Sequence, residues 1–202
     1  MPKDTYFNLP EEKQKRIFDA ALGEVLSVPI SEVSINRIVQ KAEISRGSFY
    51  QYFEDKQDLL LFVLGDGIRF IKEEISSCIE KSHGDIFTAI TMILEGVFAL
   101  GEKEIYRKTL RNVLIESSTR ECSFQFLKQF QTDLLNLLEA EMDKEKLMLK
   151  DEKEYQHLVK ILFILLKEAA ISYLYDGAHI DVYREELALQ LNMIKKGVLR
   201  KE

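Results

Sequence analysis

The chain of 202 residues is poor in the side chains that bind metals or form disulfides. Its three histidines have no cysteine or histidine close by in the sequence, so a zinc site would lack ligands. The two cysteines, Cys78 and Cys122, are far apart, which favours isolated thiols but leaves a disulfide or redox switch open. We therefore expect no metal site and no cofactor.

Long apolar runs are absent too. No apolar run reaches the roughly 18 residues that cross a membrane, and no signal-peptide pattern begins the chain. The sequence therefore predicts a cytoplasmic protein without membrane contact. No strand-like alternation of apolar and polar residues occurs, and 46% hydrophobic with 31% charged residues is typical of a globular protein.

Signatures of an enzyme are missing as well. The triplet Gly65-Asp66-Gly67 is neither a phosphate-binding loop nor a dinucleotide fingerprint. No serine or cysteine has an adjacent base that would activate it as a nucleophile. We expect no catalytic residue.

Apolar residues recur at helical spacing along most of the chain, which predicts an all-α fold of about nine helices. The first begins at Glu11 behind Pro10. The others are expected at 35–42, 45–53, 56–75, 86–101, 104–116, 122–141, 152–175 and 181–199.

The most informative segment is Ser45–Phe53, which combines a helix cap with two different faces. On a helix, Phe49 and Phe53 lie one above the other and predict a core face. The opposite and flanking positions are small or polar: Gly47, Ser48, Tyr50 and Gln51. Behind Ser34, a good N-cap, Ile35–Ala42 predicts a preceding short helix. Helix, tight turn and helix over residues 34–53 indicate a helix-turn-helix, whose second helix reads the DNA major groove.

Residues 9–71 resemble the DNA-binding domain of the tetracycline-repressor (TetR) family. The resemblance rests on Ser34-Ile35-Asn36-Arg37-Ile38-Val39, on Ile44 to Phe53, and on Asp55-Lys56-Gln57-Asp58-Leu59-Leu60. It implies a repressor that binds a palindromic double-stranded operator as a homodimer. It also implies that residues 72–202 form a helical domain that dimerises and binds a small molecule, which releases the DNA. Arg37 and Tyr52 depart from the family's frequent acidic residue and histidine.

Arg46 has the reach and forked geometry to pair with guanine, and Gln51 could pair with adenine. Two interpretations of Gly47 remain open: it allows the backbone to approach the groove closely, or it makes no contact with DNA. For Tyr52, contact with DNA and burial in the core both remain open. The expected DNA-contacting set is Ser34, Asn36, Arg37, Ser45, Arg46, Gly47, Ser48, Tyr50, Gln51, Tyr52 and Lys56.

The charge balance weighs against DNA binding by the N-terminal region as a whole. The net charge is −6, and residues 1–56 carry eight Lys and Arg against nine Asp and Glu. A favourable field must therefore be local, around Arg37, Lys41, Arg46 and Lys56. Few cations predict modest non-specific affinity, so specific binding should require the dimer.

Gly65 and Gly67 interrupt the fourth predicted helix, where a hinge and tight packing against a neighbour both remain open. The helix predicted at 152–175 is apolar over more than one face, so one face needs a partner. Together with the apolar residues of the final helix, this predicts a four-helix dimer interface. The residues expected there are Leu162, Leu166, Ala170, Tyr173, Leu187, Leu191 and Ile194.

Aromatic side chains of the middle helices could line a pocket for the effector, and two acids in apolar surroundings could receive a cationic group. The candidates are Glu95, Phe98, Tyr106, Glu116, Phe126, Phe130 and Phe163. The chemical identity of the effector does not follow from the sequence. The alternative function is a helical ligand-carrier or interaction protein that keeps the three-helix unit as a scaffold.

Overall fold

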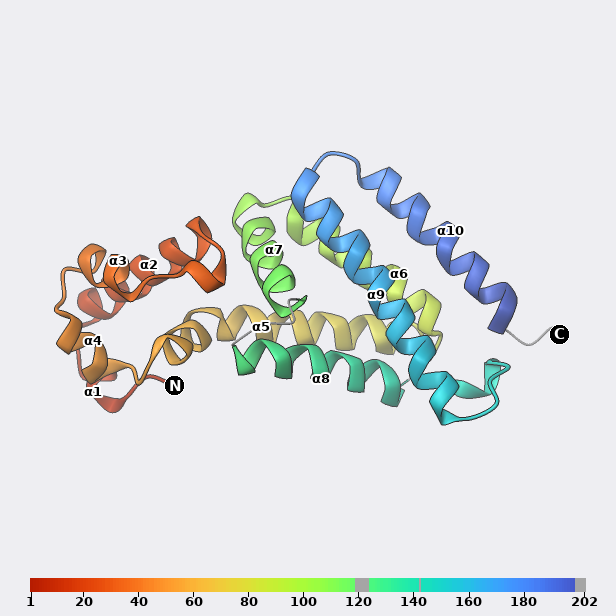
Figure 1. The fold of residues 1–202 in the computed structure, drawn as a ribbon, viewed down its shortest axis with the longest axis horizontal. Coiled ribbons are helices and arrows are strands. Elements are labelled where there is room, and N and C mark those ends of the chain that lie inside the picture. The colour runs from red at the N-terminus through yellow and green to blue at the C-terminus, as the bar shows by residue number, and fades with distance from the viewer. Residues whose placement is uncertain (119–123, 142, 199–202) are drawn as a thin grey trace. The chain divides into compact units, whose positions relative to one another are not determined.

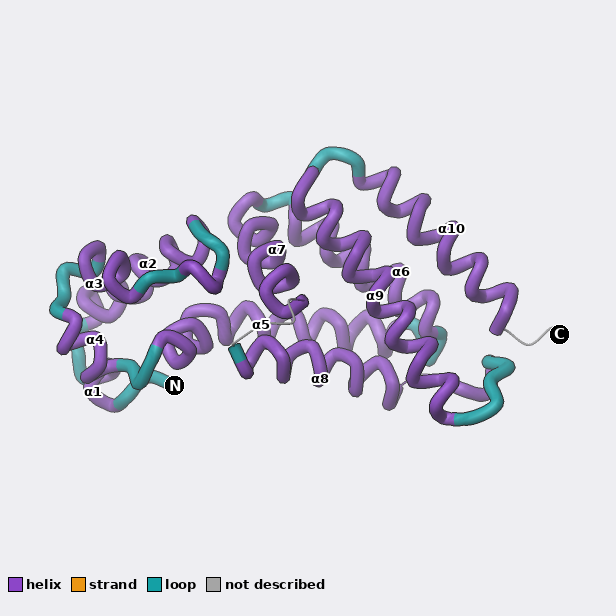
Figure 2. The backbone as a smooth tube through the Cα atoms, viewed as in Figure 1, coloured by secondary structure: helices purple, strands orange, loops and turns teal. Residues whose placement is uncertain are grey.

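The computed structural model describes residues 1–118, 124–141 and 143–198. In that part of the chain it contains ten α-helices, two short 3-10 helices and no strand element. Figure 2 colours the helices purple and the loops teal. The predicted all-α fold is confirmed. The helix that the sequence did not predict is α1 (Asp4–Phe7), whose four residues are too few to show a helical period.

The helices form two compact units. The N-terminal unit consists of residues 1–70 and 116–128, and the C-terminal unit consists of residues 71–115 and 129–202. Three helices contribute residues to both units: α5 (Lys56–Lys81), α7 (Glu104–Ser118) and α8 (Gln125–Glu141). Figure 1 labels each helix along the chain.

An aromatic cluster forms the core of the N-terminal unit, which also contains α2 (Glu11–Ser27), η1 (Ile30–Glu32), α3 (Ile35–Lys41) and α4 (Arg46–Tyr52). Phe49 and Phe53 are fully buried, with ring centroids 5.4 Å apart. The ring centroids of Phe62 and Tyr6 lie 6.0 Å and 5.4 Å, respectively, from the ring centroid of Phe53. Burial of each such side chain contributes roughly 1.5–3 kcal/mol. The cluster therefore fixes the inner face of α4, as the sequence predicted.

In the C-terminal unit, α6 (Ile86–Gly101), α9 (Glu152–Asp176) and α10 (Ile180–Val198) pack against one another. Side chains cap two of these helices. The Asp85 carboxylate accepts the Phe87 amide at 2.9 Å, and the Asp151 carboxylate accepts the Glu154 amide at 2.9 Å. α9 ends at Gly177, whose φ of 67° is the left-handed conformation common after helix ends.

The last turn of α6 passes close to the ring of Tyr173. That ring is buried, and its hydroxyl donates to the Phe98 carbonyl at 3.0 Å. A Cβ at Gly101 would lie 2.8 Å from the Tyr173 hydroxyl oxygen and closer still to the ring. Gly101 therefore permits a close approach between two helices as well as standing at the end of α6.

α5 runs as one helix through Gly65 and Gly67. A Cβ added at either glycine would meet no described atom within 4 Å. Close packing by a described neighbour therefore does not explain these residues. Each costs about 1 kcal/mol relative to alanine inside a helix, and the hinge remains a prediction.

Cys78 is a free, half-buried thiol whose pKa is raised by burial, and Cys122 lies outside the described residues. Within the described ranges, no group of three or more His, Cys, Asp or Glu side chains is placed to hold a metal ion. None of the helices described there combines the length and apolarity needed to cross a bilayer.

Candidate nucleic-acid interface

A four-residue turn, 42–45, joins α3 to α4. The Ile44 amide donates to the Val39 carbonyl at 3.0 Å, which closes the turn against the end of α3. Glu43 has a φ of 53°, in the left-handed region that lets the chain reverse over few residues. Two short helices joined in this way form the predicted helix-turn-helix.

The two helices begin differently. The Ser45 hydroxyl accepts the Ser48 amide at 3.0 Å, so Ser45 caps α4 as predicted. Ser34 stands at the N-cap position of α3, but its side chain makes no capping bond. Its amide instead donates to the buried Glu24 carboxylate at 3.2 Å. A side chain of α2 thus takes over part of the capping role at α3.

The outer face of α4 is open to solvent. Arg46, Gly47, Tyr50 and Gln51 are exposed, while Phe49 on the opposite face is buried. A Cβ at Gly47 would meet only the Ser45 hydroxyl, at an ordinary 3.6 Å, so packing within the chain does not require this glycine. Close approach to an external surface stays the prediction for Gly47.

Arg46 joins the exposed faces of the two helices. Its Nη1 donates to the Asn36 Oδ1 of α3 at 3.0 Å, and its Nη2 donates to the Tyr50 hydroxyl at 3.4 Å. The guanidinium carbon also lies 5.9 Å from the centre of the Tyr50 ring. These contacts hold a forked, permanently charged donor at the solvent side of α4.

The residues before and within α1 bind the end of α4. The Lys3 amide donates to the Tyr52 carbonyl at 2.8 Å, and the Lys3 ammonium donates to the Tyr50 carbonyl at 2.9 Å. The Thr5 hydroxyl donates to the Gln51 carbonyl. These groups satisfy carbonyls at a helix end and place a cation at its negative pole. This role was not predicted from the sequence, because partners more than 45 residues apart leave no local signal.

Arg37 has a partner inside the N-terminal unit. Its Nε donates to Glu24 Oε1 at 2.6 Å, and its Nη2 donates to the Glu32 carbonyl at 2.7 Å. Lys41 lies 3.6 Å from the other oxygen of Glu24, which is only 1% exposed. Any contact of Arg37 with DNA must therefore compete with this ion pair. Its guanidinium fixes α3 against α2.

The Glu24 carboxylate is held in its charged form. Burial alone would raise its pKa, but hydrogen bonds from Arg37 and the Ser34 amide, with the charges of Arg37 and Lys41, outweigh burial and lower the pKa. Because the folded-state pKa lies below the ordinary 4.5, this carboxylate stabilises the fold above about pH 4.5. That stabilisation is lost as the pH falls through the folded-state pKa.

We expect Glu24→Gln to lower the free energy of unfolding at pH 7 by about 1–2 kcal/mol, since the two cations left behind are half exposed and can be hydrated. Its stability should also fall less between pH 5 and pH 3 than that of the parent. Urea unfolding across this pH range measures both effects. Asp19→Asn, an exposed change on α2, is the matched control and should do neither. Equal acid sensitivity of parent and Glu24→Gln would contradict the prediction.

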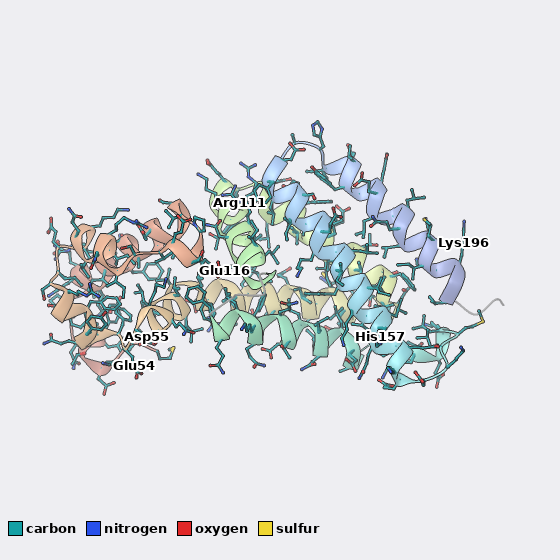
Figure 3. The ribbon with its side chains drawn as sticks, in the orientation of Figure 1. Glu54, Asp55, Arg111, Glu116, His157 and Lys196 are labelled. Atoms are coloured by element: carbon teal, nitrogen blue, oxygen red, sulfur yellow. The ribbon has the colours of Figure 1, made fainter. Side chains whose placement is uncertain are left out.

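Two other residues that were predicted to contact DNA make contacts within the N-terminal unit. Tyr52 is 6% exposed, so of the two alternatives for this residue the structure shows burial. The Lys56 ammonium donates to the carbonyls of Ser31 at 3.1 Å and Val33 at 3.3 Å. The carboxylate of Asp55, labelled in Figure 3, accepts the Asp58 amide at 2.8 Å and so caps α5.

The predicted effector-pocket residues do not converge on one site. Phe130 and Phe163 line an apolar cavity of about 70 Å³ in the C-terminal unit. Phe98 instead packs on Tyr173, with ring centroids 4.8 Å apart, and Tyr106 is 47% exposed. Glu95 is bound by Arg184 at 2.6 and 2.9 Å, which lowers the Glu95 pKa. Glu116 and Phe126 belong to the N-terminal unit.

The predicted dimer-interface residues lie mostly inside the subunit. All except the half-buried Ile194 are less than 9% exposed. The helices α9 and α10 that carry them pack on each other and on α6. The apolar side chains that these helices expose form a different set, here called the outer apolar set. Its members are Ile161, Ile164, Tyr175, Val182, Leu189 and Met193.

Two family models match the chain. Residues 17–63 match "Bacterial regulatory proteins, tetR family", and residues 85–198 match "Tetracyclin repressor-like, C-terminal domain". The helix-turn-helix and these matches define a transcriptional regulator with an N-terminal DNA-binding domain and a C-terminal helical domain. The chain belongs to the TetR family, which consists of regulators rather than enzymes. Membership implies operator DNA and small-molecule effectors as the kinds of partner.

Relatives agree with this assignment. The chain is 27% identical over 105 residues, 51% of its length, to YvdT of Bacillus subtilis strain 168, an uncharacterized HTH-type transcriptional regulator. It is 37% identical over 54 residues, 27% of its length, to the HTH-type transcriptional regulator SrpR of Pseudomonas putida. The matched regions span 50% of YvdT and 25% of SrpR.

Solved structures share the fold. A TetR family regulator from Chloroflexus aurantiacus J-10-FL covers 100% of both chains at 23% identity, with a TM-score of 0.56. NalD of Pseudomonas aeruginosa covers 95% of this chain and 99% of its own at 20% identity, with a TM-score of 0.62. At these identities the likeness shows the fold alone.

Proposed function

We propose that this protein is a ligand-responsive repressor that binds a palindromic operator as a homodimer and releases it when a small molecule binds. The observation that carries the proposal is the exposed outer face of α4, where Arg46, Tyr50 and Gln51 stand beside the backbone of Gly47. A helix that buries one face and presents hydrogen-bonding side chains on the other suits insertion into a major groove.

Repression is proposed by analogy with similar proteins. NalD is described as the secondary repressor of the MexAB-OprM multidrug efflux pump. The structure of SmeT, similar in fold with a TM-score of 0.63, is described as a complex with triclosan. These descriptions support a repressor that responds to a small molecule, and the regulated genes of this chain remain open.

The proposed dimer uses the outer apolar set of α9 and α10. Leu189 and Met193 are 64% and 67% exposed, and Ile164 is 59% exposed. Apolar side chains on the outside of two adjacent helices are typical of an interface. Pairing of α9 and α10 with their copies across a two-fold axis would bury this set in a four-helix arrangement. Such a dimer would carry two copies of α4 to two half-sites.

Fluorescence anisotropy tests the function. Labelled duplexes from the DNA flanking the coding region are titrated with the protein over a range of salt, for the parent and for Tyr50→Phe and Gln51→Ala. We expect specific binding of a palindromic duplex, and about a tenfold or greater loss for Gln51→Ala. Sedimentation should give a two-chain particle for the free protein.

Binding that ignores sequence and both substitutions would contradict the proposal and favour the carrier or scaffold function. A stable monomer at micromolar concentration would remove the two-half-site model while leaving a single half-site contact to be measured.

A further inference from the structure

The apolar cavity of the C-terminal unit has one charged residue in its wall. Its volume is about 70 Å³. The wall consists of Ile71, Ile75, Ile93, Val97, Leu110, Val113, Leu114, Phe130, Leu134, Leu138, Phe163, Leu166, Lys167 and Ala170. Thirteen of these fourteen residues are apolar, so the lysine is the position that gives the cavity chemical selectivity.

Lys167 has no anionic partner among the described residues. It is half-buried, and no described group forms a hydrogen bond or ion pair with its ammonium. The ammonium lies 5.8 Å from the centre of the Phe163 ring, another wall residue. Burial lowers the pKa of Lys167, as expected when a cation loses water without gaining a counter-charge.

A second lysine of this unit shows the contrast. Lys72 lies 5.8 Å from the centre of the Phe130 ring, and its ammonium forms an ion pair with Asp133. Its charge is therefore compensated within the chain. Lys167 has a similar ring contact but no carboxylate partner among the described residues, so its ammonium can pair with the anionic group of a bound ligand.

We propose that this cavity is the effector site and that the effector is a small amphiphilic carboxylate. Its apolar part would lie among the aliphatic and aromatic wall residues, and its carboxylate would accept a hydrogen bond from the Lys167 ammonium. This inference rests on the proposed ligand response. A carboxylate is preferred to a phosphate because a single lysine supplies one positive charge, which matches the one negative charge of a carboxylate, whereas a phosphate ester carries about −1.5 to −2 at pH 7.

The volume restricts the apolar part. A cavity of about 150 Å³ lined by similar side chains binds benzene, so about half that volume takes only a few carbon atoms. Longer tails must displace wall side chains, which costs packing energy. Affinity should therefore pass through a maximum as the tail lengthens.

Calorimetric titration of the full chain tests the inference, with butanoate, hexanoate and octanoate as probes and the alcohols of equal length as neutral counterparts. We expect a carboxylate to bind at least about tenfold more tightly than its alcohol, since hydrogen bonds to charged groups contribute more than neutral ones. Lys167→Met, which keeps an apolar stem, should remove this preference. Lys167→Gln provides a second neutral variant, and thermal unfolding checks that both fold.

Lys160→Met is the matched control, because Lys160 is an exposed lysine of the same helix and is absent from the cavity wall. It should leave the preference intact. Equal affinity for acid and alcohol, an unchanged preference in Lys167→Met, or no carboxylate binding at millimolar concentration would each overturn the inference.

Anisotropy measurements with operator DNA separate the failure of this inference from the failure of the proposed function. Failure of carboxylate binding with intact operator binding would reject the effector class alone, whereas loss of operator specificity would reject the regulator model and leave the calorimetry valid.

Discussion

Arg46→Ala should weaken binding to the specific operator by about ten- to a hundredfold, the usual contribution of a bidentate contact to a base edge. The expectation follows from the position of its guanidinium, which Asn36 and Tyr50 hold at the exposed side of α4. Arg46→Lys keeps the charge but loses the fork, so it should lose most of the specificity and retain the salt dependence. Anisotropy against the operator and a scrambled duplex measures both quantities.

Arg69→Ala is the matched control, since it removes the same charge from an exposed position on α5, where Arg69 forms an ion pair with Asp66, three residues away. Arg69 lies thirteen residues beyond the start of α5, roughly 20 Å along the helix axis. It should change operator affinity little. If Arg46→Ala weakens operator and scrambled DNA equally and lowers the salt slope by about one, Arg46 contacts phosphate and does not read a base.

Gly101→Ala should destabilise the C-terminal unit by about 1–3 kcal/mol, the usual cost of overpacking. The added methyl would collide with the Tyr173 ring, which is buried and is held by its hydrogen bond to the Phe98 carbonyl. Neither α6 nor the ring can move without opening the core between α6 and α9. Urea unfolding followed by circular dichroism measures the change.

Gly96→Ala on the same helix should change the free energy of unfolding in the opposite direction. A Cβ at Gly96 meets no described atom within 4 Å, so alanine adds helix propensity without a clash and should stabilise by up to about 1 kcal/mol. If both substitutions stabilise, the Tyr173 ring is free to move aside. If both destabilise equally, the loss comes from glycine itself and not from the contact with Tyr173.

Within the described residues, local patterns were sufficient to predict nine of the ten α-helices and the helix-turn-helix, but not the four-residue α1. The predicted segment 86–101 coincides with α6, and the predicted segment 152–175 differs from α9 by one residue. Ser45 as cap and Phe49 as inner anchor of α4 follow from spacing alone, because capping and helix faces depend on neighbours within about four residues. The same reasoning identified Gly47, Ser48, Tyr50 and Gln51 as the positions opposite or flanking the core face.

Contacts between distant segments could not be predicted in this way. The ion pair of Arg37 with Glu24 and the bonds from Lys3 to the end of α4 join residues that local spacing does not relate. The choice of which apolar face of α9 is internal also depends on where its neighbouring helices pack. Local spacing therefore did not show that Leu162 and Leu166, predicted at the dimer interface, are buried within the chain.

The sequence by itself determined the helical class of this protein, its family and the outward face of its α4, since periodicity and caps are encoded by residues a few positions apart. Only the tertiary structure decided that Arg37 is tied to Glu24, that Gly101 must lack a side chain, and that Lys167 borders an apolar cavity without a described counter-charge. The physical reason is that burial and charge compensation depend on which helices meet in space, and neighbours in the chain do not specify those meetings.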